Sequence, residues 1–280
     1  MVWYSESMSL RSAVSKFVHR TLRVPYSLHW YEFQSPKRPK ATYVFIHGIG
    51  NTLHAWDNVV AGLPSDVRVI GIDLLGFGES PKPSWAIYDA KTQARSVAMT
   101  LLGLRMAHQP VLVGHSLGAL VSVEVAKRYP LIARRLILCS PPFYKPKTLD
   151  GKRTPSLDDM LRTLYETARK HPDQLQYFSQ MAVKVGLANK ALTINDTTIA
   201  SYTAALESSI INQTALTDVG RLKLPITIFY GLFDPVVIRK HIIVLAKDKP
   251  NISLIRVNAG HEILGNYAKR LTTYISEMTS

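Results

Sequence analysis

Along most of this chain, short apolar runs are separated by longer amphipathic stretches. The runs are rich in valine, isoleucine and leucine, and several end at a glycine or a polar residue, which predicts buried strands. Strands are expected at residues 43–46, 67–72, 110–113, 135–139, 226–230 and 253–257. Because amphipathic stretches lie between most of them, the pattern favours an α/β domain built on a mostly parallel sheet.

The intervening stretches carry apolar residues at helical spacing. Helices are expected at residues 51–63, 89–104, 119–128, 236–247 and 263–278. Residues 143–220 break the alternation, because they show helical patterns near 157–170, 174–185 and 197–211 and no strong strand. Near the amino terminus, Tyr26 to Phe33 alternates in part and predicts an antiparallel edge strand.

One strand-to-helix junction carries a serine between two glycines. The expected strand at 110–113 is followed by Gly114-His-Ser116-Leu-Gly118 and then by an amphipathic helix. Gly114 allows a close approach at the turn, and Gly118 lets the helix begin against the sheet without a Cβ clash. This context predicts that Ser116 has a strained backbone and presents its hydroxyl above the strand ends, as a nucleophile does.

A nucleophilic serine needs a base and an acid that orients the base. Asp234 and His261 each lie shortly past an expected strand. Taken singly, Ser116 is explained as a helix cap, Asp234 as a turn residue before Pro235, and His261 as a capping or core histidine. Because the three residues occur in the chain order of a known triad, each past a strand, we favour a catalytic triad of Ser116, Asp234 and His261.

The expected strand at 43–46 ends in His47-Gly48-Ile49-Gly50. A flexible turn at this place is suited to supply a backbone N–H group to an oxyanion, beside the N–H of the residue after the nucleophile. We therefore expect the N–H groups of Ile49 and Leu117 to form the oxyanion hole.

With these motifs in this order, residues 25–280 resemble the α/β-hydrolase superfamily, in its lid-bearing serine hydrolase branch. A further stretch, Asp73-Leu-Leu-Gly-Phe-Gly-Glu-Ser80, is similar to a D-x-x-G-x-G-x-S loop common in that superfamily. The resemblance implies that His47 and Gly48 support the oxyanion loop. Asp73 is expected to fix backbone amides near the active site.

The resemblance also implies a fold and a domain organisation. We expect a mostly parallel central sheet with helices on both faces and an inserted helical lid. The core then comprises residues 25–142 and 221–280, and the lid comprises residues 143–220. Some members of the superfamily carry the triad acid directly after the strand at 135–139, but this chain has Ser140 there, which favours Asp234 as the acid.

On this interpretation, His261 removes the proton of Ser116 as the hydroxyl attacks an acyl carbonyl, and Asp234 orients the imidazole. This chemistry needs no cofactor and no metal. We expect a serine-dependent hydrolase of small-molecule carboxylic esters with small to medium acyl groups. C–C hydrolases of the meta-cleavage type, thioesterases and lactonases use the same triad and stay open. A ligand receptor on a hydrolase fold is an alternative of another class.

Composition sets the broad class. The chain has 280 residues, of which 46% are hydrophobic and 19% are charged, and these are ordinary globular values. The single cysteine, Cys139, excludes an intramolecular disulfide and is expected in the core. No apolar run reaches the roughly 18–20 residues that span a bilayer, and no secretory apolar segment stands near the amino terminus. We therefore expect a cytoplasmic protein of undetermined oligomeric state.

The formal net charge of +14 indicates attraction to anionic partners. No basic motif interleaved with aromatic residues and no helix-turn-helix pattern is present, so nucleic acid is not an expected partner. Residues 1–24 are expected to form a separate basic amphipathic segment, with Leu10, Val14 and Phe17 in one stripe. The stripe can dock on the domain or on a second subunit, or residues 9–23 can contact an anionic membrane peripherally.

Overall fold

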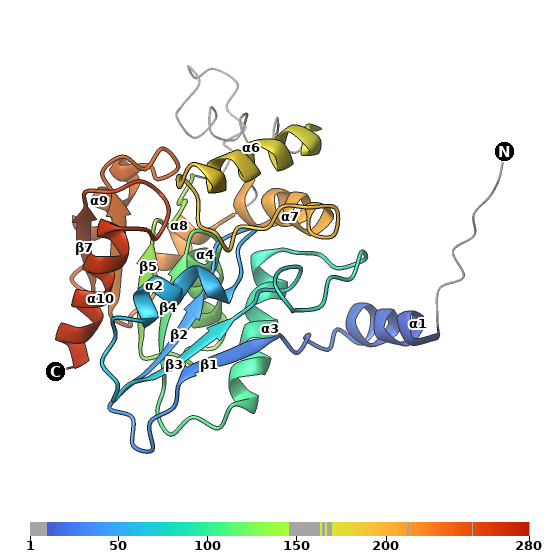
Figure 1. Cartoon of the computed structure of the whole chain (residues 1–280). Helices are drawn as coiled ribbons and strands as arrows, with labels where there is room; N and C mark the ends of the chain where they lie inside the picture. The colour runs from blue at the N-terminus through green and yellow to red at the C-terminus, as the bar shows by residue number, and fades with distance from the viewer. Residues whose placement is uncertain are drawn as a thin grey trace.

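A computed structural model of the chain describes residues 10–145, 163, 166, 170–211, 213–247 and 249–279. Its centre is a seven-stranded sheet flanked by helices (Figure 1). The strands are β1 (Trp30–Gln34), β2 (Thr42–Ile46), β3 (Arg68–Ile72), β4 (Val111–His115), β5 (Arg135–Cys139), β6 (Ile226–Gly231) and β7 (Ile252–Val257). Each predicted strand is confirmed, with ends that shift by a few residues.

The strand order across the sheet is β1-β3-β2-β4-β5-β6-β7. β1 is antiparallel to β3, and every other neighbouring pair is parallel. The carboxyl ends of the parallel strands therefore lie along one edge of the sheet, which is where ligands bind in such folds. Segments that follow β2, β4, β5, β6 and β7 are brought together at this edge.

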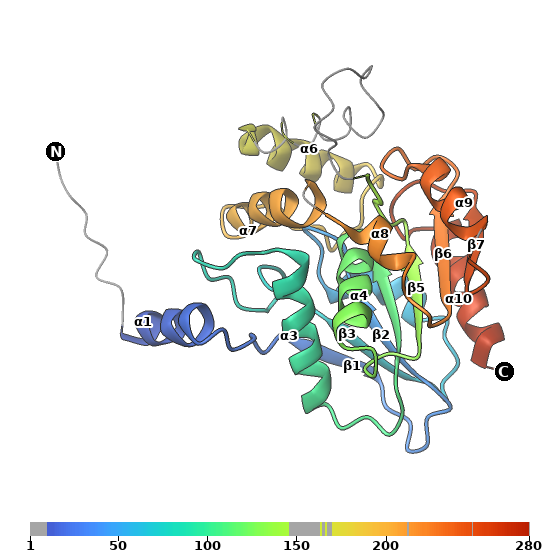
Figure 2. The same ribbon diagram turned by 180° about the vertical axis from the view of Figure 1, so that it is seen from behind.

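Helices and helical turns cover both faces of the sheet. The helices and helical turns of the described residues are α1 (Leu10–Lys16), η1 (Phe17–Thr21), η2 (Leu53–Trp56), α2 (Asp57–Val60), α3 (Ala90–Gly103), α4 (Leu117–Arg128), α6 (Pro172–Lys184), α7 (Ile199–Ala205), η3 (Leu206–Ile211), α8 (Ala215–Val219), α9 (Arg239–Lys247) and α10 (Asn266–Thr279). Residues of α3, α4, α8 and α9 share one hydrophobic cluster, and residues of η2, α2 and α10 share the other. Figure 2 shows α3 and α4 in front of the sheet.

The two clusters follow from the two-residue period of the strands. In β2, Val44 and Ile46 belong to the cluster beneath α3 and α4, whereas Tyr43 and Phe45 belong to the cluster beneath α2 and α10. The central strands are buried on both faces, which explains why their sequences are continuous apolar runs rather than alternating ones.

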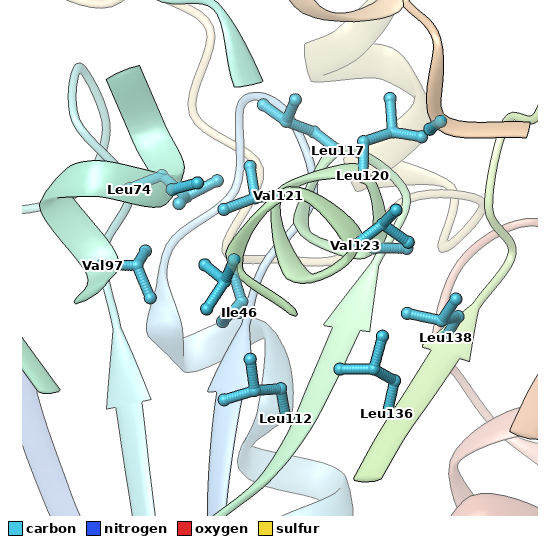
Figure 3. Packing of buried hydrophobic residues seen from close by; sticks show 14 of the residues in the cluster. Ile46, Leu74, Val97, Leu112, Leu117, Leu120, Val121, Val123, Leu136 and Leu138 are labelled. Carbon is cyan, nitrogen blue, oxygen red and sulfur yellow. The ribbon is translucent and has the colours of Figure 1, made fainter. Parts of the chain in front are cut away.

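Helix α4 packs directly on the centre of the sheet. Figure 3 shows Leu112, Leu136 and Leu138 of the strands beneath Val121 and Val123 of this helix. Burying each of these side chains contributes roughly 1.5–3 kcal/mol of hydrophobic free energy. This packing fixes the position of α4, and therefore of the turn that precedes it.

One helix prediction was wrong in part. The expected helix at 51–63 is a 3₁₀ turn, η2, followed by the single turn α2. The Thr52 hydroxyl caps this start by accepting from the His54 N–H at 3.3 Å. The Leu53 N–H instead donates to a carboxylate oxygen of Asp73 at 2.7 Å, so a tertiary contact holds the first turn.

The segment between β5 and β6 contains helices where helical patterns predicted them. The pattern at 174–185 corresponds to α6, and the pattern at 197–211 corresponds to α7 and η3. The pattern at 157–170 lies almost wholly outside the described residues. We call residues 143–220 the insertion, and their assignment as a lid stays a prediction.

The amino-terminal helix is present as α1 and η1, but its apolar stripe is exposed. Docking of this stripe on the domain, one of the arrangements that the sequence allows, is therefore not observed. Figure 1 shows α1 at the edge of the molecule, away from α9 and α10. In the described part of the chain, no helix combines the length and apolar content needed to cross a bilayer.

Candidate active site

Ser116 lies at the turn between β4 and α4, and its backbone is strained. Its φ is +50° and its ψ is −113°, in a region that residues with a side chain rarely adopt. The Ser116 N–H donates to the carbonyl of Cys139 at 2.9 Å, which ties the turn to the end of β5. The predicted strained turn is thus present, with Ser116 almost fully buried.

Two glycines make this turn sterically feasible. A Cβ atom on Gly118 would lie 2.2 Å from the carbonyl oxygen of Ile46, and one on Gly114 would lie 2.4 Å from the carbonyl oxygen of Gly118. Both distances are far below van der Waals contact, so a larger residue at either position forces β2, β4 and α4 apart. The motif therefore reflects close packing of three backbone segments at the position of Ser116.

Asp234 and His261 are brought together by the loops after β6 and β7. Oδ2 of Asp234 accepts a hydrogen bond from Nδ1 of His261 at 2.9 Å. Burial lowers the pKa of His261, but the hydrogen bond to Asp234 and the carboxylate charge outweigh burial and raise it above its usual value. Burial likewise raises the pKa of Asp234, yet the bond from His261 and its charge hold that pKa below the usual value.

The second carboxylate oxygen of Asp234 is also fixed. Oδ1 accepts from the N–H of Val236 at 2.8 Å and from the N–H of Val237 at 3.3 Å. The Ser140 hydroxyl also hydrogen-bonds to this carboxylate and further lowers its pKa. Ser140 has a φ of +48°, and its hydroxyl is also 3.2 Å from that of the buried Tyr267. Ser140, which the sequence excluded as the triad acid, thus positions the carboxylate of Asp234, the predicted acid.

His261 also lies close to the residue before the serine. Nε2 of His115 donates to the backbone carbonyl of His261 at 3.0 Å, and the two rings have centroids 5.0 Å apart. Burial and the nearby His261 lower the pKa of His115 to about 3, so His115 is neutral and its role is structural. Within the described residues, no hydrogen bond joins His261 to the Ser116 hydroxyl. Such bonds often form only when substrate binds.

The loop after β2 passes directly against Ser116. A Cβ atom on Gly48 would lie 3.3 Å from the Cβ of Ser116 and 2.9 Å from Nδ1 of His115. In the part of the chain that the structure describes, the N–H groups of Ile49 and Leu117 donate no hydrogen bond. Both donors are therefore available to a ligand, as the predicted oxyanion hole requires.

His47 supports this loop as a neutral residue. Its Nδ1 donates to the carbonyl of Gly48 at 2.7 Å, and its Nε2 accepts from the N–H of Leu74 at 2.9 Å. Both ring nitrogens are thus used, and the bonds assign the tautomer. Burial lowers the pKa of His47, which favours this neutral form. The contacts support the expectation that His47 holds the oxyanion loop.

Asp73 connects the loop after β3 with the loop after β2. Its carboxylate accepts from the N–H of Leu53 at 2.7 Å, from the N–H of Glu79 at 2.9 Å, and from His29 at 2.9 Å. A Cβ atom on Gly78, whose φ is +51°, would lie 2.1 Å from this carboxylate. The prediction that Asp73 fixes backbone amides is confirmed.

The insertion contacts the same loops. The side-chain amide of Asn189 donates to the carbonyl of Ala55 at 3.0 Å, and the N–H of Thr193 donates to the carbonyl of Gly50 at 2.7 Å. The Asn189 N–H also donates to the carboxylate of Glu262, the neighbour of His261. Burial raises the pKa of Glu262, which His261 and this bond partly offset.

Sequence reasoning missed four of these residues: His115, Ser140, Asn189 and Glu262. His115 and Glu262 are neighbours of predicted triad members, and this adjacency is the signal that was available. The contacts of Ser140 and Asn189 depend on tertiary structure and had no such signal. Among the described residues, no group of three or more His, Cys, Asp or Glu side chains is arranged to hold a metal ion.

A profile of the alpha/beta hydrolase fold family matches residues 43–191, which is more than half of the chain. A probable lysophospholipase of Arabidopsis thaliana, BODYGUARD 4, is 31% identical over 119 residues. That match covers 42% of this chain and 28% of the relative, so the chain matches less than a third of the relative's length.

Two solved structures have a similar fold. An esterase from Exiguobacterium antarcticum has a TM-score of 0.73 at 17% identity, over 90% of this chain and 95% of that one. An enol-lactonase from Burkholderia xenovorans LB400 has a TM-score of 0.72 at 18% identity, over 91% of this chain and 100% of that one. The profile, the sheet order and the arrangement of loops agree, and the chain belongs to the alpha/beta hydrolase fold family.

Proposed function

We propose that this protein is a serine hydrolase that cleaves carboxylic esters of small to medium acyl groups through an acyl-enzyme intermediate. One observation supports this most strongly. The paired Asp234 and His261 contact His115, the residue before the strained Ser116, and the N–H groups of Ile49 and Leu117 have no partner in the described structure. A nucleophile, a base, an orienting acid and oxyanion donors are the parts that acyl transfer needs.

The proposed reaction has two halves. Nε2 of His261 accepts the proton of the Ser116 hydroxyl as Oγ attacks the ester carbonyl, and the oxyanion binds to the N–H groups of Ile49 and Leu117. His261 then gives the proton to the departing alkoxide, which leaves as an alcohol. In the second half, water loses a proton to His261 and attacks the acyl-enzyme, and Ser116 regains the proton as the carboxylic acid leaves.

The raised pKa of His261 suits both halves. A stronger base accepts the serine proton more readily, and Asp234 stabilises the imidazolium that forms. An ester substrate is favoured because two proteins that share this fold are named an esterase and an enol-lactonase. The plant relative is named a probable lysophospholipase.

The test is hydrolysis of p-nitrophenyl esters from acetate to palmitate by the wild type and by Ser116→Ala. Loss of the nucleophile should lower kcat on the order of 10⁶-fold. The matched control is Thr273→Ala on the exposed side of α10, whose hydroxyl donates to the Lys269 carbonyl of the same helix at 3.0 Å, and this variant should keep full activity. A fluorophosphonate should label the wild type on Ser116 and leave Ser116→Ala unlabelled.

The same enzyme preparations should also be assayed with a thioester and a lactone. Serine-dependent turnover that is fastest on p-nitrophenyl esters supports the proposal, and the best chain length measures the acyl pocket. Faster serine-dependent turnover of the thioester or the lactone would replace the ester with that substrate class. Equal rates in wild type and Ser116→Ala would overturn the serine mechanism.

A further inference from the structure

The first helical segment of the chain presents an apolar face to solvent. Leu10 and Val14 of α1 and Phe17, the first residue of η1, recur at spacings of four and three residues, which places them on one face of this continuous helical segment. Their exposed fractions are 82%, 54% and 55%. Single exposed apolar residues are common, but three on one face of a short helix mark a surface that binds something.

This segment is held in place by contacts along α3. The ring of His19 stacks on Tyr26 with centroids 3.9 Å apart, and the N–H of Tyr26 donates to the Ser96 hydroxyl at 3.3 Å. The guanidinium of Arg95 donates to the carbonyl of Arg23 at 2.5 Å. The orientation of η1 on the domain is therefore fixed, although the apolar face of α1 stays uncovered.

A basic cavity of about 370 Å³ lies next to this helix. Arg20 and Arg23 of the amino-terminal segment line it together with Lys91 and Arg95 of α3. Asp89 is the one acid among the described lining residues, and its carboxylate caps α3 by accepting from the Thr92 N–H at 2.7 Å. The cavity therefore has an excess of positive charge.

An exposed apolar residue stands at the rim of the same cavity. Ile87, in the loop before α3, is 67% exposed. Apolar and basic side chains thus share one edge of the molecule. We call this surface the basic edge and define it by Leu10, Val14, Phe17, Arg20, Ile87 and Lys91.

We propose that the basic edge docks the protein on a lipid bilayer that contains anionic lipids. The apolar side chains enter the interface between headgroups and acyl chains, and the cationic side chains contact lipid phosphates and carboxylates. The charge of the whole chain, formally +14, adds attraction to the same surface. This docking is independent of which substrate the active site hydrolyses.

Two other partners fit the basic edge less well. A second copy of the chain in a two-fold dimer would bring Arg20 and Lys91 of both copies together, and like charges would repel. Nucleic acid would use the cations but would leave Leu10 and Val14 in water, because a phosphate backbone offers no apolar contact. A bilayer offers anionic headgroups to the cationic side chains and an apolar interior to the apolar ones.

The test is co-sedimentation of the full chain with vesicles of phosphatidylcholine, with and without phosphatidylserine. We expect binding to the mixed vesicles that weakens as salt is raised. In Arg20→Gln/Lys91→Gln, each lost cation should lower the partition coefficient about fivefold, so the pair should lower it about 25-fold. Both side chains are exposed, so thermal unfolding should be unchanged.

The matched control is Lys240→Gln/Lys269→Gln, which removes the same charge from α9 and α10 at the opposite edge of the molecule (Figure 1). It should bind the mixed vesicles within about twofold of the wild type, apart from the small effect of net charge. Equal losses in the two double variants would show that net charge alone attracts the protein, and would overturn the proposal.

The apolar half is tested by Leu10→Gln/Phe17→Gln. Each residue, if buried in the bilayer, should contribute at least about tenfold to partitioning, so the pair should lose about 100-fold or more. The control, Leu102→Gln/Leu131→Gln, replaces two residues that are 71% and 81% exposed elsewhere and should bind normally. Unchanged binding in Leu10→Gln/Phe17→Gln would overturn the proposal.

Two further measurements distinguish the other partners. Sedimentation velocity without lipid should give an oligomeric state that the double variant Leu10→Gln/Phe17→Gln does not alter. An oligomer that this variant dissociates would assign the apolar face to a second copy and overturn the bilayer. Binding to single- or double-stranded nucleic acid that is tighter than binding to the mixed vesicles would also overturn it.

Discussion

Replacing Asp234 with asparagine removes one charge from the proposed active site and leaves its shape almost unchanged. In the wild type, Oδ2 faces Nδ1 of His261 at 2.9 Å, and Oδ1 accepts from the N–H groups of Val236 and Val237 at 2.8 and 3.3 Å. An asparagine side chain has one oxygen, and the two backbone donors hold it at the inner position. Its NH₂ group must then face His261.

This substitution changes the tautomer of the His261 imidazole. The NH₂ group donates to Nδ1 of His261, so the ring proton moves to Nε2, which can no longer accept the proton of Ser116. Turning the amide over would break two backbone hydrogen bonds, each worth about 1 kcal/mol, and leave buried N–H groups without partners. The wrong tautomer should therefore dominate, and kcat should fall about 10⁴-fold, which corresponds to about 5.5 kcal/mol of transition-state stabilisation.

The assay is ester hydrolysis under saturating substrate, with ¹⁵N NMR of His261 to report the tautomer. The matched control is Asp218→Asn, which changes another buried carboxylate that accepts from Lys127 at 2.8 Å and from Thr214 at 2.7 Å, in α8. It should keep its kcat within about threefold, because it lies outside the proposed site. If Asp234→Asn kept more than a tenth of the wild-type kcat, the assigned role of Asp234 would be wrong.

Two further variants probe the packing and the charge of the site. Gly118→Ala places a Cβ atom 2.2 Å from the Ile46 carbonyl oxygen and should lower the free energy of unfolding by about 1–3 kcal/mol in denaturant titrations. Gly103→Ala, where no heavy atom lies within 4 Å of the added Cβ, should leave it equal or raise it by up to about 1 kcal/mol. In Glu262→Gln, the loss of a negative charge that raises the pKa of His261 should move the acidic limb of kcat/KM to lower pH, since the neutral imidazole is the base. A limb that stays in place or moves to higher pH would contradict the coupling of these two residues.

The sheet and its candidate nucleophile could be predicted because both depend on local patterns. A buried parallel strand needs a continuous apolar run, and the turn at Ser116 needs glycine on both sides, so each leaves a signal in a few adjacent residues. The same holds for Asp234 and His261, which follow strand ends. Chain order then related the three residues without any knowledge of distance.

Other features depend on contacts between distant segments and left no such signal. The helix expected at 51–63 is a 3₁₀ turn because Asp73, 20 residues further on, accepts from Leu53. Whether the amino-terminal apolar stripe is buried or exposed also could not be predicted from residue spacing, because a docked helix and an exposed helix can have the same amphipathic pattern. Ser140 shows the limit most clearly, since its hydrogen bond to Asp234 joins positions 94 residues apart (234 − 140).

The loop that carries the proposed oxyanion donor Ile49 is held by contacts to the core and to the insertion, and this has a consequence for specificity. His47 and Asp73 hold it from the core side, and Thr193 holds the carbonyl of Gly50 from the insertion. Donors that are fixed in advance stabilise a developing oxyanion without reorganisation. Because the insertion supplies one of these contacts, a change in its conformation should also alter the position of the Ile49 N–H. If the proposed mechanism holds, substrate selection by the insertion and the rate of the chemical step should therefore be coupled.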